Sequence, residues 1–347
     1  MAVKREFWGE APGGAPIYVY HITNNSGMEV DVLNYGCTIR NILVPDKDGN
    51  KVDVVLGFDD YKEYFDNSCF LGVAVGPSAN RVAEARYKID GKEYILPIND
   101  GPNNLHSDMN NGFHKRVWDA EEGENFVKFS LDAEDGDLGF SGNRHFEITY
   151  TLNEENALSL HYHATSDART LINMTNHTYF NLGGSGSGSI LDHTLKLYSS
   201  AYTPVIDSAA IPTGEIRNVE GTPFDFRQEK TIGRDIDADD EQLKFVGGYD
   251  HNFVVDNADG TRRMFATAVS PDTGITMQCS TTLPGVQLYT GNFLEGKNGK
   301  GGASYGKRDG FCLETQFYPN SINQEGFPDS IFGPDREYDA ITIYQFS

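Results

Sequence analysis

The sequence predicts an all-β protein made of mostly antiparallel strands, and three observations support this. Apolar and polar residues alternate with a period of two from end to end, as they do in strands with one buried face. The 21 Phe, 18 Tyr and 2 Trp residues favour pleated surfaces. The 37 Gly and 14 Pro residues supply the many turns that a sheet protein requires.

The predicted strands follow one another at short intervals. Residues 86–95 are typical of a hairpin, because Asp90 and Gly91 suit a two-residue turn with positive φ. Residues 145–152 and 157–164 predict a second hairpin around a short polar turn. The other strands are expected, in chain order, at residues 30–35, 39–44, 52–56, 194–198, 251–255, 265–269, 275–279 and 286–289.

Two segments depart from the strand pattern. Residues 237–245 carry the best helical periodicity and begin with acidic residues, so we expect two helical turns there. The Gly/Ser run Gly183–Ser189 resembles a flexible linker. Strand patterning continues on both sides of it without a change in composition, so we expect a surface loop inside one domain that spans residues 1–347.

The charge balance limits the classes of partner. With 51 acidic and 28 basic side chains, the net charge of −23 argues against nucleic acid or an anionic membrane as a partner. The apolar runs fall far short of the roughly 18 residues that a membrane-spanning helix needs. We therefore expect neither nucleic-acid binding nor a membrane protein.

The cysteines and the first residues bear on the cellular setting. None of the four cysteines forms a C-x-x-C pair, so buried free thiols are favoured over a zinc site or a disulfide framework. Residues 1–8 contain no apolar segment of the kind found in a secretory signal. Together these features predict a reducing, cytoplasmic setting. The cysteines are Cys37, Cys69, Cys279 and Cys312.

Polar residues are unusually dense in three segments: residues 99–106, 173–182 and 311–316. In the last of these, Glu314 interrupts an apolar strand, and a buried carboxylate must be paired or used because an isolated buried charge is very costly. Read one at a time, the segments are consistent with a capped turn, a core histidine and a salt-bridged glutamate.

Read together, the polar segments belong to six motifs that resemble, in this order, the aldose 1-epimerase (galactose mutarotase) family. The resemblance extends over nearly the whole chain. It implies a single-domain β-supersandwich, in which two large antiparallel sheets pack face to face with an open cleft on one side. The motifs occur as Ala79–Val82, Gly101–His106, Thr175–Leu182, Tyr249–His251, Pro284–Phe293 and Leu313–Pro319.

The resemblance also implies a reaction, the interconversion of the α and β anomers of a free aldohexose such as galactose or glucose, with no metal, nucleotide or other cofactor. Ring opening removes the proton of the anomeric hydroxyl and protonates the ring oxygen, so one base and one acid on opposite sides of the sugar ring are sufficient. By resemblance, Glu314 is the base at O1, His177 is the acid at the ring oxygen O5, and His106 is a second histidine near O5 that stabilises developing charge.

Four further residues match family positions that hold sugar hydroxyls: Asn80, Arg81, Asp250 and Gln287. An aromatic side chain against the apolar side of the sugar is also expected, and Phe293 and Tyr179 are the candidates.

The sequence departs from the family pattern at two places. The family commonly has Gly-Arg ahead of the Ala-Asn-Arg element, whereas here Gly76 is followed by Pro77-Ser78. The family histidine is usually followed by two glycines, whereas His106 is followed by Ser107-Asp108. Both departures lie beside expected sugar-binding residues, so they bear on the choice of sugar more than on the reaction.

Three other functions compete with the epimerase. A hexose-phosphate mutarotase would need a cluster of cations for the phosphate, and Arg81 stands without one. A non-catalytic sugar-binding module would need no acid and base. A glycoside hydrolase would need two carboxylates flanking the bond, for which Glu314 and Asp250 are the candidates.

The remaining histidines are expected to be structural. His161 and His163 would share one strand face, a spacing that also suits a metal, but no nearby Cys or third His reinforces it. The others are interpreted as surface or core hydrogen-bonding residues, with His251 placed to steady Asp250; they are His21, His114, His145, His193 and His251.

Overall fold

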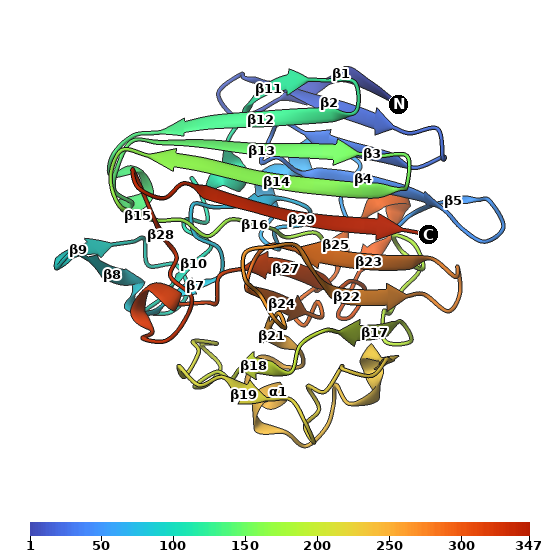
Figure 1. Cartoon of the computed structure of the whole chain (residues 1–347). Helices are drawn as coiled ribbons and strands as arrows, with labels where there is room; N and C mark the ends of the chain where they lie inside the picture. The colour runs from blue at the N-terminus through green and yellow to red at the C-terminus, as the bar shows by residue number, and fades with distance from the viewer.

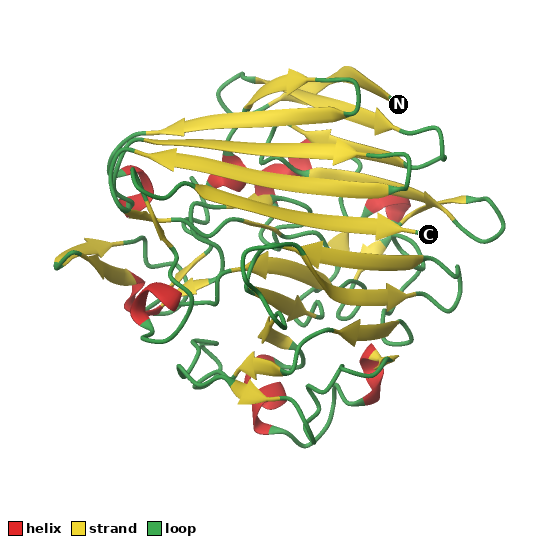
Figure 2. Cartoon of the chain, viewed as in Figure 1, coloured by secondary structure: helices red, strands yellow, loops and turns green.

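The computed structural model describes the backbone of residues 1–347 and every side chain except that of Lys297. Strands dominate the molecule, and its helices are few and short (Figure 2). Every ladder between the labelled strands is antiparallel. The prediction of an all-β, mostly antiparallel fold is therefore confirmed.

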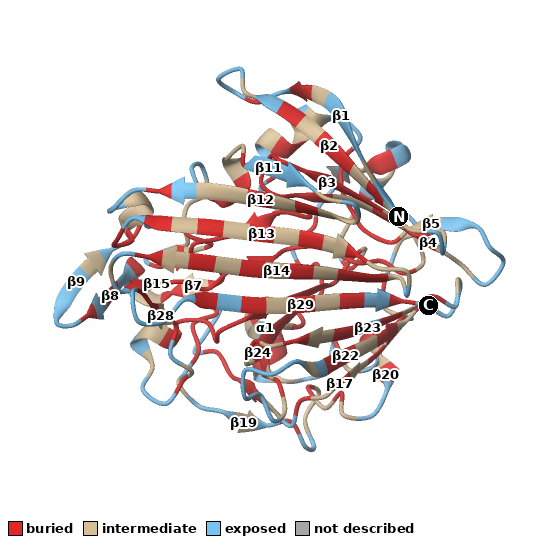
Figure 3. Cartoon of the chain, turned by 45° about the horizontal axis from the view of Figure 1, so that its top comes forward, coloured by how far each residue is buried: buried red, intermediate tan, exposed pale blue. Residues whose placement is uncertain are grey.

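The largest sheet has nine strands, and its long members cross the upper half of Figure 1. In spatial order they are β11 (Asp119–Glu122), β12 (Phe126–Ala133), β13 (Arg144–Leu152), β14 (Ala157–Ser166), β29 (Tyr338–Phe346), β23 (Thr276–Thr281), β22 (Arg263–Val269), β17 (Thr194–Leu197) and β20 (Lys230–Thr231). Along β13 and β14, buried residues alternate with partly exposed ones (Figure 3). This is the one-sided burial that the period-two pattern predicts.

Two five-stranded sheets face the same core. One contains β1 (Ala2–Glu10), β2 (Pro16–Thr23), β3 (Glu29–Leu33), β4 (Ile39–Pro45) and β5 (Lys51–Asp53). The other contains β19 (Arg217–Asn218), β18 (Ala201–Thr203), β21 (Asp250–Val254), β24 (Gly285–Tyr289) and β27 (Cys312–Gln316). Single bridges from Val55 to Phe180 and from Phe180 to Phe311 connect the ends of the two sheets.

One apolar cluster draws on all three sheets, which makes the molecule a sandwich. It includes Ile22 from β2, Ile148 from β13 and Leu288 from β24, each fully buried. Leu182 and Ile190, on either side of the Gly/Ser loop, belong to the same cluster. Burial of apolar area at about 25 cal/mol per Å² makes this shared core the main source of stability.

The smaller elements lie between the sheets and at their edges. Five two-stranded ladders pair β6 (Ala74–Val75) with β16 (Thr175–Asn176), β7 (Arg81–Val82) with β10 (Asn104–Leu105), β8 (Arg86–Ile89) with β9 (Lys92–Ile95), β15 (Thr170–Leu171) with β28 (Ile331–Phe332), and β25 (Lys297–Asn298) with β26 (Ser304–Tyr305). Short 3₁₀ helices occur at Tyr61–Asp66, Ala83–Ala85, Phe113–Lys115, Asp137–Gly139, Ile232–Arg234, Lys300–Gly302 and Ser321–Asn323.

The helix prediction is only partly right. The α-helix α1 covers Glu241–Val246, because Asp240 caps it by accepting hydrogen bonds from the N–H groups of Gln242 and Leu243. Residues 237–239 therefore lie outside it, although the sequence predicts that the helix starts there. No helix among the described residues has the length and hydropathy needed to cross a bilayer.

The predicted turns and strands agree well with the structure. Asp90 and Gly91 both have positive φ, at 53° and 80°, as a two-residue hairpin turn of this type requires. Four long strands, β1, β2, β12 and β29, lie outside the predicted segments. Alternating burial along β29 shows that this strand carries the same period-two signal as its neighbours.

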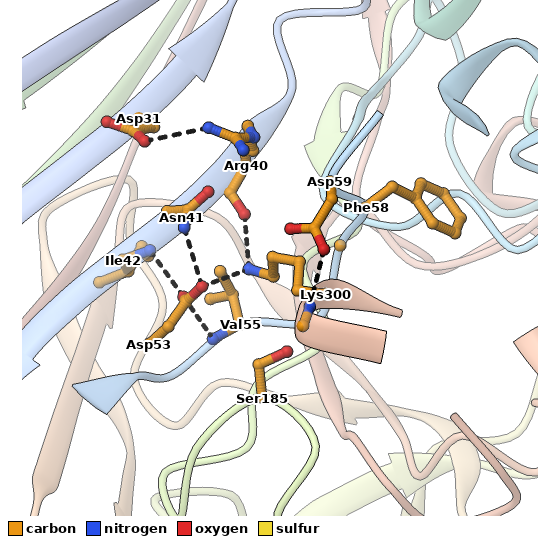
Figure 4. A network of polar contacts seen from close by, with 12 residues as sticks. Asp31, Arg40, Asn41, Ile42, Asp53, Val55, Phe58, Asp59, Ser185 and Lys300 are labelled. Carbon is orange, nitrogen blue, oxygen red and sulfur yellow. Dashed lines mark hydrogen bonds and ion pairs between the residues drawn. The ribbon is translucent and has the colours of Figure 1, made fainter. Parts of the chain in front are cut away.

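A buried ion pair fastens the loop between β24 and β27 to the N-terminal sheet (Figure 4). The ammonium of Lys300 donates hydrogen bonds to Asp53 Oδ2 at 2.5 Å and to the carbonyl oxygen of Arg40 at 2.8 Å. The same carboxylate accepts hydrogen bonds from Asn41 Nδ2 and from the main-chain N–H groups of Ile42 and Val55. Asp53 thereby ends β5 and anchors a loop that also forms part of a cavity wall.

Candidate active site

A cavity of about 460 Å³ opens where the sheet containing β21, β24 and β27 meets the loops around residues 68–81 and 105–109. Its volume lies in the usual range for small-molecule sites. Six of the seven site residues expected from the sequence line it: Asn80, Arg81, His106, His177, Asp250 and Glu314. Gln287 is absent from the described lining.

Strand alternation gives this sheet one polar face and one apolar face. Gln287 and Glu314 are register partners on β24 and β27, so they share a face. Asp250 lies opposite Tyr289 in the neighbouring ladder, on the same side. Val286, Leu288 and Leu313 point the other way into the core, which rigidly supports the polar face.

Glu314 is a deeply buried carboxyl group with few partners. Its side chain is 3% exposed, and Oε2 receives no hydrogen bond from any described residue. Burial raises the pKa of Glu314 well above the usual value; the nearby Asp250 adds to the shift, and Arg81 opposes it. A buried carboxyl group with a raised pKa and few hydrogen-bond partners is a candidate for proton transfer.

His177 lies beside Glu314, with 3.7 Å between Nε2 and Oε1. It follows β16, whose pairing with β6 fixes the backbone. Burial lowers the pKa of His177 to about 4. A sugar ring cannot fit between groups this close, so a ligand in the cavity would meet both groups from one side. Adjacent groups suit the reaction because O1 and O5 are both bonded to C1.

His106 is held by the neighbouring strand segment. Asn80 donates its main-chain N–H to His106 Nδ1 at 3.0 Å, and His106 donates its own main-chain N–H to the carbonyl of Asn80 at 2.9 Å. With Nδ1 accepting, the ring proton must lie on Nε2. Burial lowers the pKa of His106 well below its usual value, so it remains a neutral N–H donor.

Arg81 and Asp250 are each oriented by a residue that the sequence reasoning did not connect with them. Arg81 donates from Nε to Asp100 Oδ2 at 2.8 Å, which holds the guanidinium at the cavity. Gln287 donates from Nε2 to Asp250 Oδ1 at 2.7 Å, and Gln316 in turn donates to Gln287 Oε1 at 3.1 Å. Gln287 is thus placed behind Asp250, as its support.

Aromatic side chains form the rest of the wall. Tyr179 and Phe293, the two candidates for an aromatic face, both line the cavity. Phe293 is 64% exposed and stacks on Tyr289 with 6.5 Å between ring centroids, so it lies at the mouth. Phe70, which sequence reasoning missed, contacts the rings of both His106 and His177.

His106, His177 and Glu314 bring ligand atoms within 4.8 Å of one another, a grouping that could hold a metal ion. The hydrogen bonding of His106 opposes this. A metal at Nε2 would require the ring proton to move to Nδ1, where it would face the N–H of Asn80. The donor set therefore fits a proton-handling site better than a metal site.

The two departures from the family pattern contact each other. Ser107 Oγ accepts a hydrogen bond from the N–H of Ser78 and donates one to its carbonyl, both at 2.9 Å. Ser107 has φ = 68°, a conformation that favours glycine, and these two hydrogen bonds compensate for the strain. Neither serine lines the described cavity, so the departures brace the segment that carries His106.

None of the other histidines lines the described cavity. His161 and His163 on β14 point outward and contact separate carboxylates, Asp339 at 3.3 Å and Glu337 at 3.1 Å. They join no group of three metal ligands among the described side chains. His251 is fully buried and accepts the main-chain N–H of Asp250 at 3.3 Å, so it does steady that residue.

A sandwich of antiparallel sheets with a buried histidine beside a buried carboxyl group in a small-molecule cavity is typical of an enzyme that moves protons on a small polar ligand. The model of the aldose 1-epimerase family matches residues 18–345, and the chain belongs to this family. It is 40% identical over 348 residues to the galactose mutarotase of Bos taurus, covering 100% of this chain and 99% of that protein. It is 38% identical over 339 residues to the aldose 1-epimerase of Escherichia coli, covering 97% of each.

Solved structures agree with this assignment. The crystal structure of galactose 1-epimerase from Lactobacillus acidophilus superimposes with a TM-score of 0.86 at 30% identity, covering 100% of this chain and 99% of that one. An aldose epimerase homologue from C. elegans gives a TM-score of 0.85 at 31% identity, covering 99% of each chain. The family and the fold implied by the sequence resemblance are therefore confirmed.

Proposed function

We propose that the cavity binds a free aldohexose, with galactose and glucose as candidate sugars, and interconverts its α and β anomers by two proton transfers. The observation that carries this proposal is the 3.7 Å separation between His177 Nε2 and Glu314 Oε1 at the bottom of the cavity. Two groups this close can exchange protons with O1 and O5, which are both bonded to the anomeric carbon.

The pair works with one shared proton. In the ion-pair form Glu314 is a carboxylate and His177 an imidazolium, so Glu314 takes the proton of the O1 hydroxyl while His177 protonates O5. The C1–O5 bond breaks, O1 becomes the aldehyde oxygen, and the pair is left neutral. Rotation about C1–C2 and the reverse transfers close the ring as the other anomer. Burial disfavours charge on both residues, which favours the neutral form that ring opening produces.

His106 has a different role from His177. Because Asn80 blocks its Nδ1, the fixed Nε2–H can donate a hydrogen bond to the sugar but cannot easily accept a second proton. We assign His106 to hold O5 and to stabilise the charge that develops there.

Substrate positioning falls to the polar side chains around the pair. Arg81 and Asp250 line the cavity, and each is oriented by a hydrogen bond from behind, as described above. Asn80 completes the set that contacts hydroxyl groups. Gln287 contributes by fixing Asp250, and Phe293 and Tyr179 offer the apolar surface that one side of a pyranose requires.

The competing functions have less support. Arg81 is the one Lys or Arg in the described cavity lining, and Glu295 lies there too, which disfavours a sugar phosphate. Glu314 and Asp250 rise from the same sheet face, separated by β24, so they lie to one side of a ligand and do not flank a glycosidic bond. A binding module would not need a buried carboxyl group with a raised pKa.

We also propose that residues 1–347 act as one catalytic domain without a metal or other cofactor, in the cytoplasm. Residues on both sides of the Gly/Ser loop share the core, which supports a single domain. Four free thiols, three of them buried, suit a reducing compartment.

Polarimetry on freshly dissolved α-galactose and α-glucose tests the function. The protein should speed the approach to the equilibrium rotation, after subtraction of the spontaneous rate, and EDTA treatment should leave the rate unchanged. Sugar binding without acceleration would indicate a binding module. Activity confined to hexose phosphates, or lost with EDTA and restored by zinc, would overturn the proposal.

A further inference from the structure

The two cavity histidines differ in what contacts Nδ1. In His106 this atom meets a main-chain N–H, whereas in His177 it lies 3.5 Å from the sulfur of Cys312. Cys312 is fully buried and precedes Glu314 by two residues on β27, so both side chains lie on the same face of the strand. One strand therefore carries the base and a group that touches the acid.

The sulfur lies beside Nδ1 of His177, and a main-chain carbonyl lies near the same ring. Burial raises the pKa of the Cys312 thiol, so the sulfur keeps its own proton and is a weak, neutral acceptor. The main-chain carbonyl of His177 is the other acceptor near the ring, and it already accepts the N–H of Gly72 at 3.1 Å. These surroundings favour a proton on Nδ1 that points to sulfur.

The proton count of the reaction agrees with this arrangement. His177 must give up the proton on Nε2, beside Glu314, and stay neutral afterwards. That is possible only if Nδ1 keeps its proton throughout, because otherwise the ring would become an imidazolate. His106 has the reverse arrangement, with its proton fixed on Nε2.

We propose that Cys312 is a positioning residue that accepts the Nδ1–H of His177, so that the two histidines are held in opposite tautomers and only His177 exchanges a proton with the substrate. This inference rests on the proposed function for its consequence in catalysis, but the tautomers themselves are a property of the protein alone. It explains how His106 serves as a fixed hydrogen-bond donor while the neighbouring His177 serves as the acid.

Nitrogen-15 NMR of histidine-labelled wild-type protein tests the tautomers directly, with the His177 signals assigned by their absence in His177→Asn. We expect a protonated Nδ1 in His177 and a protonated Nε2 in His106 at neutral pH. A neutral His177 protonated on Nε2 would overturn the proposal, whether or not the protein has mutarotase activity. Absence of activity with the expected tautomers would count against the proposed function alone.

Variants of Cys312 test the consequence. Cys312→Ala removes the acceptor, and since a neutral hydrogen bond changes equilibria by about 3- to 10-fold, kcat should fall by that factor with KM unchanged. Cys312→Ser restores an acceptor and should recover kcat. Cys279→Ala is the matched control for loss of packing, because Cys279 is also a buried thiol, on β23, and lies outside the cavity lining. Equal kcat in Cys312→Ala and the wild type, with the His177 tautomer unaltered, would contradict the role.

Discussion

Asp53 and Glu314 are both largely buried carboxyl groups, yet their surroundings differ in every polar contact. Asp53 accepts hydrogen bonds from the ammonium of Lys300, from one side-chain amide and from two main-chain N–H groups. Glu314 has His177 at 3.7 Å, and one of its oxygens has no described partner. The donors around Asp53 stabilise its carboxylate and the fold. The carboxyl group of Glu314 lacks such donors, which suits the proton exchange proposed for it.

The pKa shifts of Asp53 and Glu314 show the same contrast. Burial raises the pKa of Asp53, but the contact with Lys300 and the N–H donors work against the shift. Burial raises the pKa of Glu314 with only Arg81 opposing it, while Asp250 adds to it. Within one fold, the number of donors around a buried carboxyl group therefore distinguishes the structural site at Asp53 from the proposed catalytic site at Glu314.

The largest expected effect comes from Glu314→Gln, which keeps the shape of the side chain but removes the base. Positioned general-base catalysis contributes roughly 10²–10⁴-fold, so kcat should fall on that scale while galactose still binds. Mutarotation rates and sugar titration measure the two effects. Near wild-type turnover would contradict the assignment of Glu314.

The same variant should be more stable than the wild type at neutral pH. A carboxyl group whose pKa is raised by folding contributes stability below its unfolded-state pKa and loses it as the pH rises through the folded-state value. Glu314→Gln removes this loss, so the stability difference should vanish below about pH 4. Urea denaturation at several pH values measures it.

Lys300→Met should lower the stability of the protein and leave the rate of the reaction largely unchanged. Removing one partner of a buried ion pair typically costs about 3–5 kcal/mol, because the other charge is left uncompensated. Lys244→Met, which breaks an exposed ion pair with Asp239, is the matched control and should cost under about 1 kcal/mol. In the folded variant kcat should be retained, with KM raised because the loop bearing Phe293 is less firmly held. A loss of kcat comparable to that of Glu314→Gln would remove the contrast between the two sites.

The pH dependence of kcat should be bell-shaped, with limbs that belong to the pair of Glu314 and His177. Burial lowers the pKa of His177 to about 4. As the pH falls through this value, the pair gains a second proton and Glu314 can no longer accept one. As the pH rises through the raised pKa of Glu314, the pair loses its working proton. Activity should fall about tenfold per pH unit beyond each limb. A flat profile from pH 3 to pH 9 would contradict the shared-proton mechanism.

The smallest effect is expected for Ser107→Gly. Glycine relieves the positive φ but loses both hydrogen bonds to Ser78, so the stability should change by less than about 1 kcal/mol. His106 should be less firmly oriented, and kcat should fall by less than about tenfold. Thermal unfolding and initial rates, compared with those of an exposed serine variant such as Ser26→Gly, measure this.

The sequence predicts most of the strands and six residues that meet in the cavity, but not how those residues are supported. Alternation predicts the strands and places Glu314 and Gln316 on one face. It cannot predict which strands become neighbours, so the placement of Gln287 behind Asp250 follows only from the register of β21, β24 and β27. The roles of Asp100 and Cys312 were equally inaccessible, although both lie in segments that stood out for their polar residues, because long-range side-chain contacts leave no local signal.

The position of β29 has a consequence for the order of folding. This strand, residues 338–346, lies between β14 and β23 in the middle of the nine-stranded sheet. Until it is in place, the strands formed by residues 119–166 and those formed by residues 194–281 present two unpaired edges to each other. Contacts this distant in sequence form slowly. The halves of the molecule should therefore remain prone to association with other chains during synthesis, until one late strand joins them.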